Sequence, residues 1–163
     1  MMCFLGLGSN MSNRLDNLSN SINMISKDKN NKVLNISSFY ESDPMYNHSL
    51  DKFYNGVIKI ETSYSPEQLL IFVKDIEEKL GRKKTTDDRY ENRPIDIDIL
   101  CCGSAIIKSR ELVVPHPHIK ERKFVLKPWS DIDSDYIIAN ENRKIKELLD
   151  VTLDESILKK IYA

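Results

Sequence analysis

Hydrophobic and polar residues alternate along residues 93–100 in the pattern of a β-strand with one buried face. Ile95, Ile97 and Ile99 alternate with Asp96 and Asp98. A period of two places the isoleucines on one face and both carboxylates on the other. Aspartate is uncommon in strands, and like charges on one face repel each other. The stretch therefore predicts a strand whose polar face attracts a cation, with an ordinary amphipathic strand as the alternative.

Two other segments have the three- and four-residue spacing of amphipathic helices. Their apolar stripes consist of Leu15, Leu18, Ile22 and Ile25 in the first segment and Leu69, Val73, Ile76 and Leu80 in the second. Ser12 or Asn13 is expected to cap the first helix. Ser65-Pro66-Glu67-Gln68 predicts the start of the second as a capping box, and Gly81 predicts its end.

The remaining β-rich segments complete a recognisable order of elements. Residues 3–7, 33–40 and 53–62 are expected to be strands. The resulting order βαββαβ predicts an α+β fold of the ferredoxin-like type. Both helices would then cover one sheet face and leave the other open for an active site.

The last third of the chain is less regular. We expect extra C-terminal strands, one of them at residues 112–114, and short helices at residues 145–149 and 155–161. Asp154 is the predicted cap of the last helix. Residues 1–163 are interpreted as a single domain, since a chain of this length can bury one substantial core.

Composition limits the possible partners. The net charge is −1, with 30% charged and 40% hydrophobic residues, so no overall charge attracts nucleic acid or an anionic membrane. No apolar run approaches the roughly 20 residues of a membrane span. Cys3, Cys101 and Cys102 lie in apolar segments and are expected to be buried, reduced thiols. We therefore expect a cytoplasmic monomer that binds neither nucleic acid nor membrane.

Two sets of basic residues flank the acidic strand. The upstream set is Arg82, Lys83, Lys84, Arg89 and Arg93, and the downstream set is His116, His118, Lys120, Arg122 and Lys123. Mg²⁺ is commonly held by one or two carboxylates plus substrate phosphates, and arginine pairs well with phosphate oxygens. Together these residues predict a site for a divalent cation and a polyphosphate. For any single basic residue, a solvated charged loop is the alternative.

Two further features concern ligand recognition. Phe53 and Asn55 share one face of their predicted strand, where they could stack on and hydrogen-bond a flat heterocycle. Core placement is the alternative for Phe53. Glu77 lies at the edge of its helix stripe and is expected to be a surface carboxylate unless it orients Arg82 or the nucleotide. No Walker A or protein-kinase motif occurs.

Several short motifs occur together in an order that characterises one family. They are Gly8-Ser9-Asn10, Phe53-Tyr54-Asn55, Gly81-Arg82, Arg93-Pro94-Ile95-Asp96-Ile97-Asp98-Ile99-Leu100, Val114-Pro115-His116-Pro117-His118 and Glu121-Arg122-Lys123-Phe124-Val125-Leu126. Up to Trp129 the chain resembles the 6-hydroxymethyl-7,8-dihydropterin pyrophosphokinase family of folate biosynthesis. The resemblance implies transfer of the βγ-pyrophosphoryl group of ATP to the pterin hydroxymethyl oxygen, leaving AMP.

The resemblance also implies roles for individual residues. Two Mg²⁺ ions would be held by Asp96 and Asp98. Apart from the resemblance, Asp96 is our candidate for a general base, with a metal-bound alkoxide that needs no base as the alternative. The implied catalytic residues are Arg82, Lys84, Arg93, Asp96, Asp98 and Arg122. The implied contacts to the co-substrate ATP are Glu77, Arg82, Lys84, Arg93, Ile99, His116 and Arg122. The implied pterin contacts are Ser42, Asp43, Pro44, Met45, Phe53, Asn55, Tyr90, Asp96 and Phe124.

The sequence departs from the family pattern at three positions. Tyr90 stands where the family usually has Trp, Lys84 where it often has Arg, and Phe53 where some relatives have Tyr. Tyrosine can still seal a pterin site, lysine can still meet a phosphate without the bidentate fork, and phenylalanine keeps the stacking surface.

Two other functions fit parts of the pattern. A metal-dependent nucleotidyl- or glycosyltransferase would use the same D-x-D chemistry. A ferredoxin-like RNA-binding module would use the open sheet face for stacking bases, but the acidic pair on that face argues against it. We further expect the polar segments at 42–51 and 82–93 to close over the substrates as lids.

Overall fold

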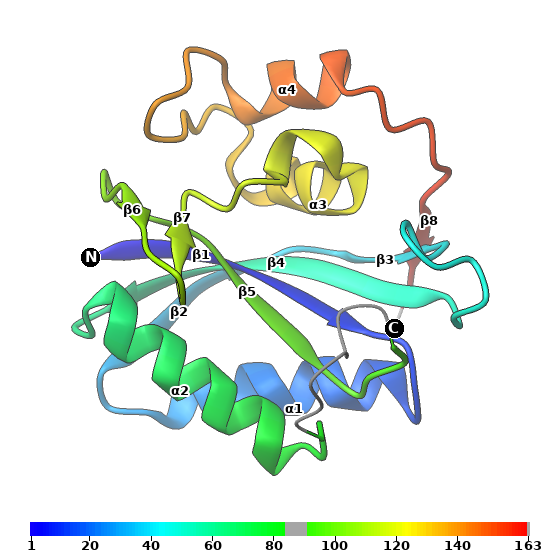
Figure 1. Cartoon of the computed structure of the whole chain (residues 1–163), viewed down its shortest axis with the longest axis horizontal. Coiled ribbons are helices and arrows are strands. Elements are labelled where there is room, and N and C mark those ends of the chain that lie inside the picture. Colours follow the sequence, from blue (N-terminus) through cyan, green and yellow to red (C-terminus); the bar gives the residue numbers. More distant parts are fainter. Residues whose placement is uncertain (84–90, 163) are drawn as a thin grey trace.

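A six-stranded antiparallel sheet separates two layers of helices (Figure 1). The computed structural model describes residues 1–83 and 91–162. Strands follow the order β5-β1-β4-β3-β8 across the sheet, and β2 also pairs with β4. Helices α1 and α2 lie on one side of the sheet, and α3 and α4 lie on the other (Figure 1).

The order of the elements confirms the predicted βαββαβ core. The strands are β1 (Met2–Ser9), β2 (Asn31–Ile36), β3 (Phe39–Ser42), β4 (Phe53–Thr62), β5 (Asp96–Cys102) and β8 (Lys159–Ile161), with β6 (Ile107–Lys108) and β7 (Val113–Val114) as a separate hairpin. The helices are α1 (Arg14–Lys27), α2 (Pro66–Lys79), α3 (Lys123–Asp133) and α4 (Ile145–Val151), and a short 3₁₀ helix (Ile119–Glu121) precedes α3.

The helix boundaries of the first half follow the predicted local signals. Asn13 caps α1, and its side chain accepts the Asp16 N–H at 3.1 Å. Ser65 and Gln68 form the predicted capping box at the start of α2. Gly81 follows α2 with φ of +99°, a left-handed conformation that favours glycine.

The predicted strand at 33–40 is wrong in one respect, because it is two strands. β2 and β3 both pair with β4, and the strand conformation is interrupted between them at residues 37–38. Ser37 explains the break, because its hydroxyl accepts the Val57 N–H at 2.9 Å and so replaces a backbone carbonyl of the ladder.

Two hydrophobic clusters lie on opposite faces of the sheet. Ile95, Ile97 and Ile99 belong to the cluster beneath α1 and α2, as their alternation predicted. On the other face Trp129 of α3 packs against Phe4 of β1, with ring centroids 4.7 Å apart. α3 covers part of this face, and the part near the start of β5 lies open in the described structure.

The prediction of a helix at 155–161 is wrong. Residues 152–158 have no regular secondary structure, and Lys159–Ile161 form β8 beside β3. Ile157 is 86% exposed, so an apolar stripe in this segment would have nothing to pack against. Asp154 therefore does not cap a helix at 155–161; its carboxylate instead accepts the Lys123 N–H at the start of α3 at 2.8 Å. The short helix expected at 145–149 is confirmed as α4.

Two sequence-based expectations concern the whole chain. Cys3, Cys101 and Cys102 are buried free thiols, as predicted. Among the described residues, no helix has the length and apolarity needed to cross a membrane.

Candidate active site

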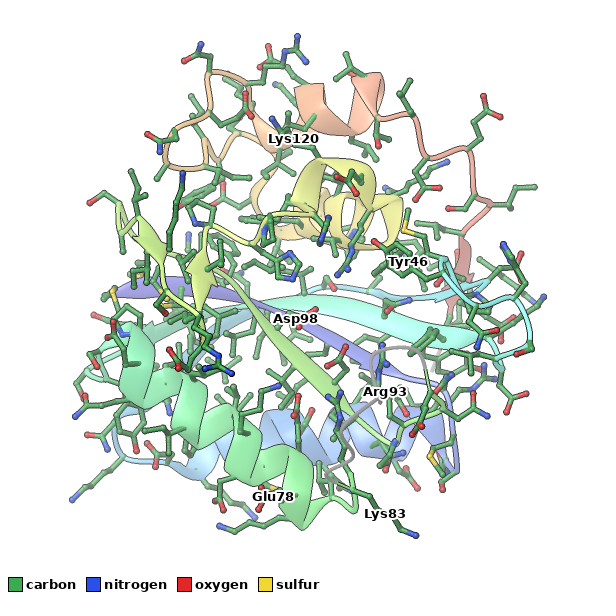
Figure 2. All side chains as sticks on the ribbon, viewed as in Figure 1. Tyr46, Glu78, Lys83, Arg93, Asp98 and Lys120 are labelled. Atoms are coloured by element: carbon green, nitrogen blue, oxygen red, sulfur yellow. The ribbon has the colours of Figure 1, made fainter. Side chains whose placement is uncertain are left out.

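A cavity of about 420 Å³ opens on the part of the sheet that α3 leaves uncovered. Its floor includes β1, β4 and β5, and its walls come from α2, the β3–β4 loop and residues 116–125. Figure 2 shows Asp98 near the middle of the molecule, with Tyr46 above it and Arg93 below it to the right. The predicted residues that line the cavity are Ser42, Asp43, Met45, Phe53, Asn55, Arg82, Arg93, Asp96, Asp98, His116, Arg122 and Phe124.

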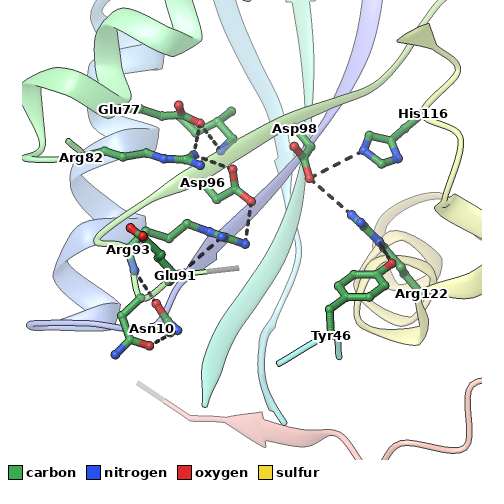
Figure 3. A network of polar contacts seen from close by, with 12 residues as sticks. Asn10, Tyr46, Glu77, Arg82, Glu91, Arg93, Asp96, Asp98, His116 and Arg122 are labelled. Carbon is green, nitrogen blue, oxygen red and sulfur yellow. Dashed lines mark hydrogen bonds and ion pairs between the residues drawn. The ribbon is translucent and has the colours of Figure 1, made fainter. Parts of the chain in front are cut away.

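Asp96 lies between two arginines. One carboxylate oxygen accepts from Arg82 Nη1 at 2.7 Å, and the other is 3.4 Å from Arg93 Nη2 (Figure 3). Burial opposes ionisation, but Arg93 and Arg82 outweigh it and hold the pKa of Asp96 below its usual value. Asp96 is therefore an anion at neutral pH and a weak base.

Asp98 has much poorer compensation. Its Oδ2 atom is 3.6 Å from Arg122 Nη1 and 4.0 Å from His116 Nε2 (Figure 3). Burial and the negative charge of Asp96 raise the pKa of Asp98 to about 7. Burial and the charge of Arg122 lower the pKa of His116 to about 4, so this imidazole is neutral at pH 7. The charge of Asp98 is thus the one that a bound cation would stabilise most.

The donor set of the cavity fits magnesium better than zinc. Across residues 1–83 and 91–162, no group of three or more His, Cys, Asp or Glu residues could hold a metal by itself. Zinc sites need three or four such ligands, whereas Mg²⁺ is commonly held by one or two carboxylates together with substrate phosphates. Asp96 and Asp98 meet the second requirement.

Glu77 is not the surface carboxylate that was expected. Its side chain is buried and lies beneath β5, where Oε1 accepts the Ile97 N–H at 2.8 Å and contacts Arg82 Nη1 at 3.1 Å. Lys74 is 3.2 Å from the other oxygen. Burial, the largest cause, raises the pKa of Glu77. This carboxylate therefore joins α2 to β5 and orients Arg82 toward Asp96, the alternative that the sequence left open.

We expect Glu77→Ala to lower the free energy of unfolding by about 2–3 kcal/mol, because the buried Ile97 N–H would lose its acceptor. Urea denaturation measures this change. Asp75→Ala, which removes a half-exposed carboxylate of the same helix paired with Lys79, is the matched control and is expected to cost below about 0.5 kcal/mol. Equal effects of the two substitutions would contradict the structural role of Glu77.

The opposite end of the cavity is formed by aromatic and polar side chains, with Asp43 as an exposed carboxylate among them. Phe53 and Asn55 point into it from β4, and Phe124 of α3 lines the same cavity. Asn55 is buried and donates to the Ser42 hydroxyl at 2.7 Å. Gly8 permits this arrangement, since a Cβ there would lie 3.1 Å from Asn55 Oδ1. This end suits a flat ligand with polar edges.

Among the lining residues that sequence reasoning did not assign to the site are two polar side chains, Tyr46 and Lys74. Tyr46 lies in the β3–β4 loop, and Arg122 Nε donates to its hydroxyl at 3.3 Å. Nothing in the sequence distinguishes it from other loop residues. Lys74 precedes Glu77 by three residues, and that helical spacing could have placed it on the same face of α2.

The other predicted site residues stand as follows. Lys84 and Tyr90 lie outside the described residues. Pro44 is buried beside the cavity without lining it. The Ile99 side chain belongs to the core beneath α1 and α2, so that only its backbone is available to a nucleotide. His118, expected on the surface, is half-exposed at the cavity rim.

Residues 4–134 match the family model described as 7,8-dihydro-6-hydroxymethylpterin-pyrophosphokinase. The chain is 34% identical over 156 residues to the 2-amino-4-hydroxy-6-hydroxymethyldihydropteridine pyrophosphokinase of Haemophilus influenzae, covering 96% of both chains. It is 42% identical over 154 residues to the folic acid synthesis protein fol1 of Pneumocystis carinii, covering 94% of this chain and 20% of that protein. The chain also spans only 20% of the corresponding proteins of Schizosaccharomyces pombe and Dictyostelium discoideum.

Solved structures show a similar fold. The wild-type HPPK-DHPS of Plasmodium falciparum with pteroate superimposes with a TM-score of 0.69 at 17% identity, covering 91% of this chain and 42% of that one. At this level of identity the likeness concerns the fold alone.

Proposed function

The chain belongs to the 7,8-dihydro-6-hydroxymethylpterin-pyrophosphokinase family, and from this premise we propose that it transfers pyrophosphate from ATP to 6-hydroxymethyl-7,8-dihydropterin, with AMP as the second product. Residues 1–163 would act as one catalytic domain. The observation that carries the proposal is the carboxylate pair Asp96 and Asp98, set between arginines in a cavity whose far end is aromatic.

The charged end of the cavity suits a triphosphate. Arg82 and Arg93 approach Asp96 from one side, and Arg122 approaches Asp98 from the other (Figure 3). Guanidinium groups pair with phosphate oxygens as readily as with carboxylates. A bound triphosphate would therefore take over these arginines, and the two carboxylates would be left to hold Mg²⁺.

Magnesium would supply charge neutralisation on the transferred group and alignment of the phosphates. The residues of the chain supply the rest. Arg82 and Arg93 would bind phosphate oxygens, and neutral His116 would donate one hydrogen bond without adding charge. Displacement at phosphorus needs no protein nucleophile, so placement of the two substrates is the main task.

The aromatic end would hold the pterin. Phe53 and Phe124 would contact the ring faces, and Asn55, already oriented by Ser42, would read a polar edge. This arrangement would direct the hydroxymethyl group toward Asp96 and Asp98. The lowered pKa of Asp96 makes it a poor general base, so deprotonation of the hydroxyl would depend on the electrostatics of the site as a whole.

Product analysis tests this function. We expect ATP, Mg²⁺ and the reduced pterin to give AMP and a pterin pyrophosphate in equal amounts, measured by chromatography and ³¹P NMR. Omission of the pterin or addition of excess chelator should stop AMP formation. Formation of ADP, or AMP release that does not depend on the pterin, would contradict the proposal, and a thermal shift with nucleotide sugars instead would favour a glycosyltransferase.

A further inference from the structure

Asn10 is a buried residue that joins three separate segments of the chain. It follows β1, and only 1% of its surface is exposed. The Asn10 side-chain oxygen accepts the Arg93 backbone N–H at 2.6 Å, and the Asn10 backbone N–H donates to the Arg93 carbonyl at 3.1 Å. Its amide nitrogen donates to Asn92 Oδ1 at 2.8 Å and to the Asp51 carbonyl at 3.2 Å. Every polar group of this side chain therefore has a protein partner.

Asp51 and Asn92 also bond directly to each other. The Asp51 N–H donates to Asn92 Oδ1 at 3.1 Å, and Asn92 Nδ2 donates to an Asp51 carboxylate oxygen at 3.2 Å. We name Asn10, Asp51 and Asn92 the asparagine clasp. It connects the end of the β3–β4 loop with the segment that leads into β5, although these segments are 41 residues apart in the sequence.

Each end of the clasp belongs to a chain segment that also contributes residues to the cavity lining. Asp51 belongs to the β3–β4 loop, whose residues Asp43, Met45 and Tyr46 line the proposed pterin end. Asn92 immediately precedes Arg93, whose guanidinium lies 3.4 Å from Asp96 and 5.1 Å from the centre of the Phe53 ring. A shift of either segment must therefore move the other or break the clasp.

We propose that Asp51 and Asn92 are positioning residues that couple the two substrates, so that the loop closing on the pterin fixes Arg93 at the triphosphate. This inference rests on the proposed function. Neither side chain lines the cavity. If the bound pterin raises the affinity for the nucleotide by a given factor, the bound nucleotide must raise the affinity for the pterin by the same factor, because binding free energies are reciprocal.

The exposure of the Asn92 and Asp51 side chains allows their coupling role to be tested apart from a role in stabilising the fold. Asn92 and Asp51 are exposed, and hydrogen bonds that water can replace contribute little to stability. Removal of the Asn92 side chain should therefore uncouple the segments and leave the fold intact. Asn10 is unsuitable for this test, because its buried amide and its bonds to Arg93 make its loss destabilising.

The test is calorimetric titration with 6-hydroxymethylpterin, with and without saturating Mg²⁺ and α,β-methylene-ATP. We expect the nucleotide analogue to tighten pterin binding of the wild-type chain at least about fivefold, the lower range of typical couplings. Asn92→Ala should reduce this factor to below about twofold, with each single-ligand affinity nearly unchanged. Asp51→Ala removes only the carboxylate contact and should give an intermediate factor, because the Asp51 N–H and carbonyl keep their bonding positions. His48→Ala, an exposed substitution in the same loop, should keep the wild-type factor.

A double substitution provides the rescue. With Asn92→Asp and Asp51→Asn together, the amide at 51 donates to the carboxylate at 92, and the direct bond is restored in the opposite direction. We expect the coupling factor to recover. If Asn92→Ala kept the wild-type coupling factor, the proposed coupling role of the clasp would be wrong. The same holds if this variant unfolded and lost its affinity for each single ligand, while the proposed function would stand in both cases. A wild-type chain that binds neither pterin nor nucleotide would overturn the proposed function as well.

Discussion

Asp98→Asn is expected to lower turnover about 10³-fold, the scale on which loss of one group that stabilises developing charge slows an enzyme. The substitution keeps the shape of the side chain and removes its charge. Asp96 cannot replace it, because the proposed site uses both carboxylates, and Asp96 alone would leave the bound cations with one protein anion instead of two. Steady-state rates with ATP, pterin and varied Mg²⁺ measure the loss, which excess Mg²⁺ should restore only in part.

The same substitution should not destabilise the protein. In the absence of a cation, the Asp98 carboxylate faces Asp96, and among residues 1–83 and 91–162 its nearest cation is Arg122 at 3.6 Å. Burial and Asp96 together raise the pKa of Asp98 to about 7. A neutral amide removes this repulsion, so the free energy of unfolding should stay equal or rise. Stability that opposes function in this way is typical of active sites.

A matched control separates the role of the site from a general loss of charge. Asp135→Asn neutralises an exposed carboxylate between Lys144 and Lys146, which lies outside the cavity. We expect its turnover to match that of the wild-type chain. If Asp98→Asn also kept its Mg²⁺-dependent turnover, Asp98 would not be a metal ligand.

The elements that sequence patterns predicted correctly are those whose signals are local. The alternation around Asp96 and Asp98 fixes which face of β5 carries the carboxylates, and the Ser65 capping box fixes where α2 begins. Residues 155–161 also have helix-like spacing, yet they form an extended segment and β8. β8 pairs with the edge of β3, and this edge exists only in the folded sheet. The local pattern of residues 155–161 therefore could not indicate the pairing.

The residues of the candidate site also differ in whether a local sequence pattern could predict them. Family motifs identify the residues that we propose bind the ligands, and most of those that the structure describes line the cavity. The residues that support them depend on distant partners. Glu77 was misjudged because its acceptor role depends on the Ile97 N–H, which comes 20 residues later. The clasp of Asn10, Asp51 and Asn92 depends on contacts over 41 and 82 residues, which no periodicity could indicate.

Arg122→Ala is expected to reduce turnover about 100-fold while changing pterin affinity less than about fivefold. Arg122 lies at the boundary between the two ends of the cavity. Its guanidinium is 3.6 Å from Asp98 and lies 5.5 and 5.7 Å from the ring centres of Tyr46 and Phe124. Tyr46 is an exposed ring, and a cation–π contact with an exposed ring contributes about 0.5–1 kcal/mol, whereas a charge that stabilises the phosphoryl group in the transition state contributes several.

Two further variants decide whether charge or geometry carries the effect of Arg122. Arg122→Lys keeps the charge but loses the planar fork, and we expect turnover between those of Arg122→Ala and the wild-type chain. Arg143→Ala, which removes an exposed arginine outside the cavity, should leave both turnover and affinity unchanged. A large loss of pterin affinity with normal turnover in Arg122→Ala would assign this arginine to the pterin wall instead of the phosphate end. The contact of Arg122 with Asp98 would then serve only to balance charge in the metal-free protein.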